Sequence, residues 1–441
     1  MNRKIFISIM LVVAILVAIS GCTRSSGSST SNAGQNQLVL NMDPTGLGDI
    51  FADMVVAFKE KYPEIEVIAD IDQGSSARLQ PLMVAGNPPD VVFVNLFEYD
   101  LFGGIIAHQY QDVEFIMNEK VDGTDNTYMD LFSPSIIEAA SYQGKVMLAP
   151  CTRLVTCLVY DKKMLRDAGL TPPKTAEELI ALAGPLADRG IALYAYTGVY
   201  ASYVLDSHIA LAVYAYGGEK AYNDSFYIAS KGGWYSDAVK RALQDFVNIR
   251  NNGMLRGTVA LDHIQSQMEL LNRRVAFVPT GSWFEVEMGD SIPADFEIGF
   301  IPVPAQSPAG IEVVGALTNG LAVPANAKNP ENAKKFIQFF YSAEGQRICC
   351  EYGLTPSLAN IDEKASSYFT QSEKELYDYI ARNNVVYVDL MPEMIYPTLY
   401  EVLSDNINLL VLGEITVDQF CDAAENEAER IRNDPAIPKV K

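Results

Sequence analysis

The sequence predicts an α/β fold in which a mostly parallel sheet is flanked by helices. Strand-type and helix-type apolar patterns alternate between residues 37 and 94, in the order strand, helix, strand, helix, strand. The same alternation continues to about residue 340. Because helices that connect successive strands bring those strands into a parallel sheet, this order favours a sheet covered by helices over an all-helical or all-β protein.

The first elements follow from residue spacing. Residues 37–41 are an apolar strand, and Pro44 breaks it. Four apolar residues at helical spacing then predict a helix that ends before Pro63; they are Phe51, Met54, Val55 and Phe58. The next elements are a strand at 64–67, a helix at 76–85 and a buried-type strand at 91–94.

Later elements continue the pattern. Residues 144–150 and 154–160 are predicted as two strands, and Thr175 with Glu178 forms a capping box that opens a helix to Arg189. The remaining predictions are a helix striped by Val239, Leu243 and Phe246 to about Gly253, a strand at 275–278, a helix from Asn329 with its core stripe at Ala333, Phe336, Ile337 and Phe340, and a mostly helical chain after Pro356.

The N-terminus has the pattern of an export signal. Arg3 and Lys4 precede an apolar run at 5–18, which is too short to span a membrane as a helix. The run ends in Ser20-Gly21-Cys22, which resembles a bacterial lipobox. The sequence therefore predicts a signal peptide at 1–21, a lipid-modified (palmitoylated) Cys22 and a flexible Ser/Gly-rich tether at 22–36. The alternative is an ordinary thiol after a cleaved signal.

Composition limits the classes of partner. The 441-residue chain has a formal net charge of −22, and removal of the basic signal peptide makes it more acidic. This charge repels nucleic acid and anionic lipid, so we expect neither as a partner. No second apolar segment is long enough to span a bilayer, and we therefore expect a folded protein anchored at the outer face of the cell membrane.

The cysteines and histidines do not indicate a metal site or a catalytic triad. Five cysteines follow Cys22, an odd number without zinc-ligand spacing, and we expect them to be buried free thiols. The three histidines form no cluster or HExxH motif. We therefore predict no metal, no cofactor, no catalytic residues and no enzymatic activity.

Five stretches carry a resemblance to a known family. They are FKEKYPEIEV (58–67), PDVVF (89–93), YQGKVMLAP (142–150) with VYDK (159–162) and AGLTPPKT (168–175), RVAFVPTGSW (274–283), and NPENAKKFIQFF (329–340) with GLTP (353–356). In this order they resemble the extracellular solute-binding proteins of ABC importers, in the carbohydrate-binding family that includes maltose-binding protein.

The resemblance implies a two-lobed periplasmic-binding-protein-like fold with three crossings between the lobes, near 150–158, 296–304 and 353–358. Lobe 1 would comprise 37–150 plus 305–352, and lobe 2 would comprise 151–304 plus 353–441. A ligand, expected to be a carbohydrate, would lie between the lobes, and hinge closure would present it to the permease subunits. We expect a monomer.

The resemblance also nominates ligand-binding residues. Trp283 stands where the family has an aromatic platform for a sugar ring, and its alternative is a core tryptophan. The second tryptophan, Trp234, is expected to have a packing or surface role. Strand ends of the first lobe nominate Asp43, Thr45, Asn95 and Glu98, for which helix caps or surface charges are the alternatives.

Three further residues complete the predicted site. Arg153, at the first crossing, is expected either to bind a carboxylate or hydroxyl pair of the ligand or to pair with an acid at the hinge. Tyr200 lies in a loop that opens a helix within a tyrosine-rich segment. Asn319 stands where relatives bring the backbone close to the sugar, and is also an ordinary turn residue.

Other functions remain open from the sequence. A surface glycosidase would use two carboxylates, but no nucleophile motif is present. The same receptor class could instead take a polyamine, a metal chelate, a glycerol phosphate or a peptide. A lipoprotein used only for adhesion or sensing would bind without a permease.

Overall fold

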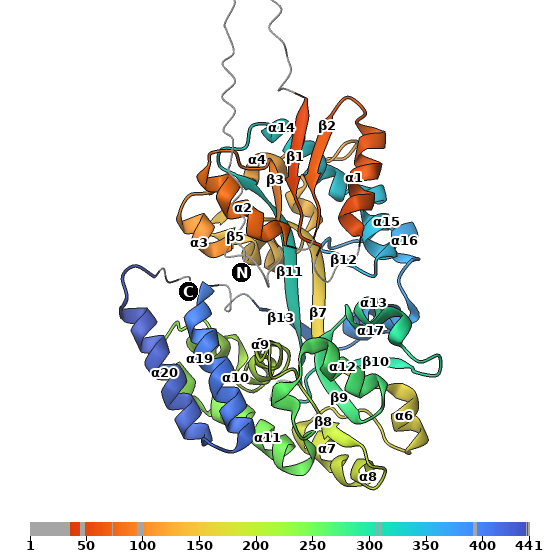
Figure 1. The fold of residues 1–441 in the computed structure, drawn as a ribbon, viewed down its shortest axis with the longest axis vertical. Helices are drawn as coiled ribbons and strands as arrows, with labels where there is room; N and C mark the ends of the chain where they lie inside the picture. The colour runs from red at the N-terminus through yellow and green to blue at the C-terminus, as the bar shows by residue number, and fades with distance from the viewer. Residues whose placement is uncertain are drawn as a thin grey trace, which may run out of the picture. The chain divides into compact units, whose positions relative to one another are not determined.

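Two long antiparallel strands, β7 (Ala149–Asp161) and β11 (Glu312–Pro324), organise the computed structural model of the protein (Figure 1). The structure describes residues 36–44, 49–72, 74–94, 101–305, 307, 310–390, 395–437 and 439. The strand order through the main sheet of these residues is β2-β1-β3-β11-β7-β9-β8. β7 and β11 therefore join two groups of elements, which we name the first and second lobes.

The first lobe contains the parallel strands β1 (Gln37–Asn41), β2 (Glu66–Asp70) and β3 (Val91–Val94). β3 pairs antiparallel with the last third of β11, where Leu321 lies opposite Phe93. The flanking helices are α1 (Ile50–Lys61), α2 (Ser75–Val84), α14 (Pro330–Phe340) and α15 (Ala343–Glu351). The Phe58 ring of α1 lies 5.2 Å from that of Phe336 in α14, so this lobe has an aromatic core.

The second lobe is built around the other ends of the two long strands. β8 (Ala192–Tyr194) pairs parallel with β9 (Val275–Gly281), which pairs antiparallel with β7. β10 (Ile298–Ile301) lies against the last residues of β7, and β13 (Val385–Asp389) runs parallel to the start of β11. The longer helices of this lobe are α10 (Ala210–Ser225), α11 (Asp237–Gly253), α17 (Gln371–Arg382), α19 (Pro397–Leu412) and α20 (Val417–Asn433).

The remaining elements are short. The strands are β4 (Tyr110–Gln111), β5 (Ser141–Tyr142), β6 (Lys145–Val146) and β12 (Thr355–Pro356). The helices are α3 (Leu101–Ile106), α4 (Glu114–Met117), α5 (Pro134–Ala139), α6 (Lys162–Asp167), α7 (Ala176–Ala181), α8 (Ala183–Ala187), α9 (Ser202–Val204), α12 (His263–Leu271), α13 (Phe284–Met288) and α16 (Glu363–Ser366).

Most predicted elements are confirmed. The strand at 37–41, the helix striped by Phe51 and Phe58, the strand at 91–94 and the helix starting at Asn329-Pro330 have the predicted places. The strand predicted at 64–67 begins two residues later, because residues 66–70 are the ones that pair with β1.

Three predictions about elements are wrong in part. The strands predicted at 144–150 and 154–160 are not separated by a break, because β7 runs through Pro150 at a bulge beside Asn319 and Gly320, where a missing N–H is tolerated. The helix opened by Thr175 is interrupted at Leu182 between α7 and α8. The mostly helical C-terminal part also contains β13.

The strand pairing bears on the three crossings. β7 covers 150–158, and β12, within 353–358, pairs with β7 at Arg153. Residues 298–301 instead pair with the end of β7 inside the second lobe, and β11 runs beside β7 from Thr156 back to Ala149. We propose that β11 carries the second crossing, and the exact lobe boundaries stay a prediction.

Burial settles two smaller predictions. Trp234 is fully buried against Phe226, with 4.9 Å between ring centroids, so its expected packing role is confirmed. The five cysteines of the described residues are free and buried, as expected, and burial raises the pKa of Cys151 to about 12. None of the helices that the structure describes is long and apolar enough to cross a bilayer.

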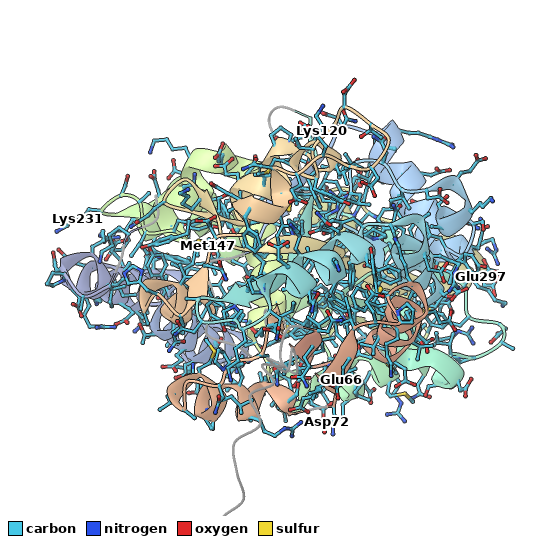
Figure 2. All side chains as sticks on the ribbon, turned by 90° about the horizontal axis from the view of Figure 1, so that it is seen from above. Glu66, Asp72, Lys120, Met147, Lys231 and Glu297 are labelled. Carbon is cyan, nitrogen blue, oxygen red and sulfur yellow. The ribbon has the colours of Figure 1, made fainter. Side chains whose placement is uncertain are left out.

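Charged side chains occupy the surface. Lys120, Lys231 and Glu297 project outward in Figure 2, and each forms an ion pair that water can reach. Exposed pairs of this kind contribute little to stability, so the long strands and the core carry the fold.

Candidate functional site

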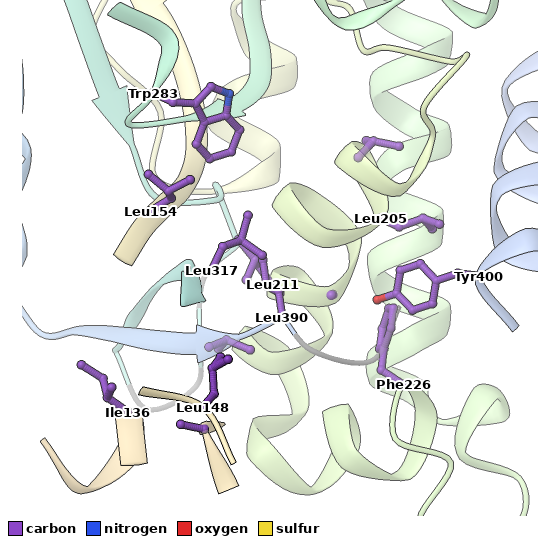
Figure 3. Packing of buried hydrophobic residues seen from close by; sticks show 14 of the residues in the cluster. Ile136, Leu148, Leu154, Leu205, Leu211, Phe226, Trp283, Leu317, Leu390 and Tyr400 are labelled. Carbon is purple, nitrogen blue, oxygen red and sulfur yellow. The ribbon is translucent and has the colours of Figure 1, made fainter. Parts of the chain in front are cut away.

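The two faces of β7 and β11 differ at the middle of the strands. Side chains alternate along a strand, so Leu154 and its neighbour Arg153 point to opposite faces. Leu154 lies opposite Leu317 of β11, and Figure 3 shows both on the side of Trp283. We call this side the Trp283 face and the other side the Arg153 face.

Trp283 is held by the turn between β9 and α13. The Ser282 backbone N–H donates to the Val155 carbonyl at 2.8 Å, and Ser282 Oγ accepts from the Val155 N–H at 3.2 Å. A Cβ on Gly281 would lie 2.0 Å from the Trp283 ring, so only glycine lets the ring lie there. Trp283 is 7% exposed and belongs to the buried hydrophobic cluster, so its alternative role as a core tryptophan stays open beside the predicted ligand contact.

Three further rings continue from Trp283 toward solvent. The Tyr203 ring lies 6.2 Å from Trp283 and 6.3 Å from the His263 imidazole, with which it is nearly parallel. Tyr200 lies 5.7 Å from His263 and is 49% exposed. We call Trp283, Tyr203, His263 and Tyr200 the aromatic row.

Polar groups lie beside the aromatic row. His263 Nε2 lies 3.2 Å from a Glu287 oxygen, and the other Glu287 oxygen accepts from Gln267 Nε2 at 2.6 Å. The hydrogen bond to Glu287 raises the pKa of His263, although partial burial opposes the shift. Apolar ring faces beside hydrogen-bonding groups suit a ligand with C–H faces and hydroxyl edges.

A π-helical turn directly follows α9, the short helix that contains Tyr203. Residues Leu205–Ile209 form a π-helical segment, a feature common at functional sites. It buries His208, whose Nδ1 lies 3.0 Å from the Tyr194 hydroxyl, and burial lowers the pKa of His208 to about 3. Asp206 in the same turn accepts from the Tyr400 hydroxyl at 2.7 Å. These contacts fix the segment that carries Tyr200 and Tyr203.

Asn319 lies on the Trp283 face of β11. It belongs to a strand, so the alternative of a turn residue is wrong. Its side-chain nitrogen donates to Thr152 Oγ1 at 3.4 Å, whereas its Oδ1 is buried without a hydrogen-bond partner. An unmet buried acceptor is costly, so this oxygen is a point of unfavourable energy in the structure.

Arg153 lies on the opposite face from Trp283. Its guanidinium carbon lies 4.5 Å from the centroid of the Tyr387 ring in β13, and its Nε is buried without an acceptor. Among the described residues no acid forms an ion pair with Arg153. The alternative in which Arg153 pairs with an acid at the hinge is therefore not supported by these residues. The structure does not bring Arg153 and Trp283 together.

In the first lobe, Asp43 is buried and makes helix-capping hydrogen bonds. One carboxylate oxygen accepts from the Gly74 N–H at 2.9 Å and from the Ser76 hydroxyl at 3.0 Å, at the start of α2. These bonds match the helix-cap alternative. Three predicted ligand-binding residues and the predicted lipid anchor lie outside the described residues; they are Thr45, Asn95, Glu98 and Cys22.

Sequence reasoning missed Tyr203 and His263 as members of one group. Tyr203 follows Tyr200 by three residues, which puts both near the start of α9. The capping box of Asp262 and Gln265 starts α12 at His263. The contact between these two segments joins residues about 60 positions apart, which no local pattern shows.

A separate pocket of about 340 Å³ lies in the second lobe. Its lining includes Tyr160, Lys162, Lys174 and Tyr379, and none of the predicted site residues. Lys162 already pairs with Glu375 at 2.5 Å, so we assign no ligand to it. In the described part of the chain, no group of His, Cys, Asp and Glu residues is placed to hold a metal ion.

Comparisons with known proteins agree with this architecture. The model of a family described as bacterial extracellular solute-binding proteins matches residues 43–347. The diacetylchitobiose-binding protein NgcE of Streptomyces coelicolor is 22% identical over 409 residues, covering 89% of this chain and 83% of that protein.

Solved structures are similar in fold. A probable secreted solute-binding lipoprotein from Streptomyces coelicolor has a TM-score of 0.73 at 16% identity, covering 90% of this chain and 99% of that one. Maltose-bound MalE3 of T. maritima has a TM-score of 0.70 at 18% identity, covering 90% and 99%. These two-lobed proteins share the predicted fold class, which is thereby confirmed.

Proposed function

Because the chain belongs to the family of bacterial extracellular solute-binding proteins, we propose that it captures a sugar or oligosaccharide for an ABC importer. The aromatic row beside the Glu287 carboxylate is the observation that carries this proposal, since clustered aromatic rings with adjacent polar groups suit the two kinds of surface on a sugar. Relatives named for diacetylchitobiose and maltose support the ligand class.

The long strands supply a mechanism for capture. β7 and β11 run from one lobe to the other, so small dihedral changes at their middle would rotate the lobes. A sugar that contacts Trp283 and also the first lobe makes both sets of contacts only when the lobes are closed. Binding would therefore shift the population to the closed form that a permease recognises.

The membrane attachment is a separate part of the proposal and rests on the sequence. We propose that Cys22 carries the lipid anchor of a monomeric receptor at the outer face of the cell membrane. The tether at 22–36 would hold the receptor near its permease and raise its effective concentration there.

A thermal-shift screen tests the proposed ligand class. Mono- and oligosaccharides, amino acids, peptides, polyamines and glycerol phosphates are added separately to the purified protein. A micromolar ligand, worth about −8 kcal/mol, should raise the melting temperature through mass action. A shift by saccharides only is expected, whereas a shift by another class without any saccharide would contradict the proposal.

Incubation with the saccharides that bind tests the alternative of a glycosidase. The named relatives are binding proteins, so we expect each saccharide to be recovered intact. Release of shorter products by the purified protein would contradict a purely binding role.

A further inference from the structure

The loop that carries Tyr200 is fixed on one side by a second loop of the same lobe. Gly198 is buried, whereas Tyr200, two residues later, is 49% exposed. The Gly198 N–H donates to the Thr258 carbonyl at 3.2 Å. A Cβ on Gly198 would lie 2.3 Å from the Cα atom of Val259, so only glycine allows the two loops to approach this closely.

The carbonyl group of Gly198 is held by α19. Its oxygen accepts from Asn408 Nδ2 at 2.9 Å, and Asn408 Oδ1 accepts from the Tyr196 hydroxyl at 2.7 Å. A carbonyl oxygen can only accept, so the amide nitrogen of Asn408 has to face Gly198 and its oxygen has to face Tyr196. Because a buried carbonyl without a donor is costly, Asn408 stabilises this position of the Gly198 backbone.

The same helix holds the segment at a second point. The Tyr400 hydroxyl of α19 donates to Asp206 in the π-helical turn that follows α9. Gly198 and Asp206 lie on either side of Tyr200 and Tyr203 in the sequence. Helix α19 therefore contacts the segment both before and after the two tyrosines of the aromatic row.

We propose that Asn408 is a positioning residue for ligand binding, which sets the place of the Tyr200 loop through the Gly198 carbonyl. Both polar groups of its amide are used in bonds to Gly198 and Tyr196, so it acts through the loop rather than by contact with a sugar. This inference rests on the proposed function and adds to it a residue more than 200 positions from the loop that it holds.

Hydrogen exchange of the ligand-free protein tests the contact with the loop. Asn408→Asp keeps the acceptor for Tyr196 but removes the N–H that Gly198 accepts, so the Gly198 amide should exchange about tenfold faster. Asn406→Asp is the matched control, because Asn406 Nδ2 donates to the Val402 carbonyl within α19. It makes the same change in the same helix and should leave the exchange of Gly198 as in wild type.

Calorimetric titration tests the effect on binding. The probes are glucose, galactose, maltose, raffinose and diacetylchitobiose, and the saccharide that wild type binds most tightly is used for all variants. Asn408→Asp should weaken its binding about tenfold, and Asn406→Asp should change it by about twofold or less. In a Tyr200→Ala protein, Asn408→Asp should weaken binding further by only about threefold or less, because residues that act through one another are not additive.

The outcomes separate positioning from a general structural role. An equal loss of affinity from Asn408→Asp with and without Tyr200 would overturn the proposal. Asn408→Ala removes the same donor without adding a charge, and an unchanged affinity in both Asn408 variants would also overturn it. So would a loss of cooperative urea unfolding in both, because Asn408 would then be needed for the fold itself.

The same titrations distinguish this inference from the proposed function. If wild type binds none of the five saccharides, the proposed function fails and the inference fails with it. If wild type binds a saccharide and the Asn408 variants bind it equally well, only the inference fails.

Discussion

The two faces of β7 carry different side chains, with the proposed ligand contacts on one face and contacts with β12 and β13 on the other. On the Trp283 face lie Leu154, paired with Leu317, and Asn319, paired with Thr152, and the Trp283 ring contacts the next ring of the aromatic row. On the Arg153 face, the guanidinium covers Tyr387 of β13, and the Thr355 hydroxyl of β12 hydrogen-bonds Tyr377 of α17. Neighbouring side chains of β7 thus point in opposite directions, one toward the proposed binding surface and the next toward β12 and β13.

This comparison explains why Arg153 and Trp283 should behave differently. The sequence nominated Arg153 for its place at the first crossing, whereas the resemblance nominated Trp283 as an aromatic platform for a sugar ring. Alternation along the strand sends Leu154 toward Trp283 and Arg153 away from it. Variants of Trp283, Asn319 and Arg153 would break or sharpen this division, and the acid sensitivity of His208 tests the segment that carries Tyr200 and Tyr203.

Trp283→Ala should weaken sugar binding about 100-fold or more, because it removes the inner ring of the row. Loss of this largely buried side chain should also lower the free energy of unfolding by about 3 kcal/mol. Trp234→Ala is the matched control, since Trp234 is fully buried elsewhere in the second lobe. It should destabilise similarly and keep the affinity, and a loss of affinity in both variants would show that the effect is unfolding rather than contact.

His208 should make stability fall in acid. Its pKa in the folded protein, about 3, lies below the usual value near 6.5, so protons bind preferentially to the unfolded chain between these values. Stability is therefore complete above about pH 6.5 and lost as the pH falls, by up to about 1.4 kcal/mol per pH unit from this residue.

Urea unfolding of wild type and His208→Gln between pH 4 and pH 7 measures the effect. The free energy of unfolding is plotted against pH for both proteins, and the difference between the two slopes is the His208 contribution, since the carboxyl groups titrate in both proteins. Identical slopes would mean that His208 is not buried in its neutral form. His263, with a raised pKa, has the opposite sign, because its contribution is present below about pH 6.5 and is lost as the pH rises through its folded pKa.

Asn319→Ala should weaken sugar binding about tenfold if its unmet Oδ1 accepts a ligand hydroxyl. Thr152→Val removes only the partner of the Asn319 side-chain nitrogen and serves as the control. Calorimetry on both variants separates the two roles. Equal losses in the two variants would assign the effect to the Asn319–Thr152 hydrogen bond.

Arg153→Met should change sugar affinity by about threefold or less, through the hinge rather than through contact. It removes the contact with Tyr387 and also a guanidinium with an unmet buried Nε, so the two effects on stability oppose each other. Calorimetry and urea unfolding measure both. A loss as large as that of Trp283→Ala would place Arg153 in the ligand site after all.

The fold was largely predictable because its elements follow local patterns. The stripe of Phe51, Met54 and Phe58 is the buried face of α1, and the run at 91–94 is the strand β3. The long strands were less predictable, because the pairing of β7 with β11 across Pro150 joins segments far apart in the sequence. Strand alternation could nevertheless have separated Arg153 from Leu154.

The site was predictable only in part. Trp283 and Tyr200 were nominated from the resemblance and from local sequence, and the structure links their side chains through the rings of Tyr203 and His263. That link depends on the packing of α9 against α12, which residue spacing does not contain. For Asp43 the sequence pattern did not decide between two roles. This polar residue after a strand makes the hydrogen bonds of a helix cap in the structure.

Tryptophan fluorescence tests the central claim most directly, because the chain has two tryptophans. Trp234→Phe leaves Trp283 as the single emitter, and Trp283→Phe leaves the buried Trp234. We expect a saturable change in the emission of the Trp234→Phe protein at the sugar concentrations where calorimetry detects binding, and a much smaller change in the Trp283→Phe protein. Sugar binding detected by calorimetry without any change in the emission of Trp283 would contradict the account.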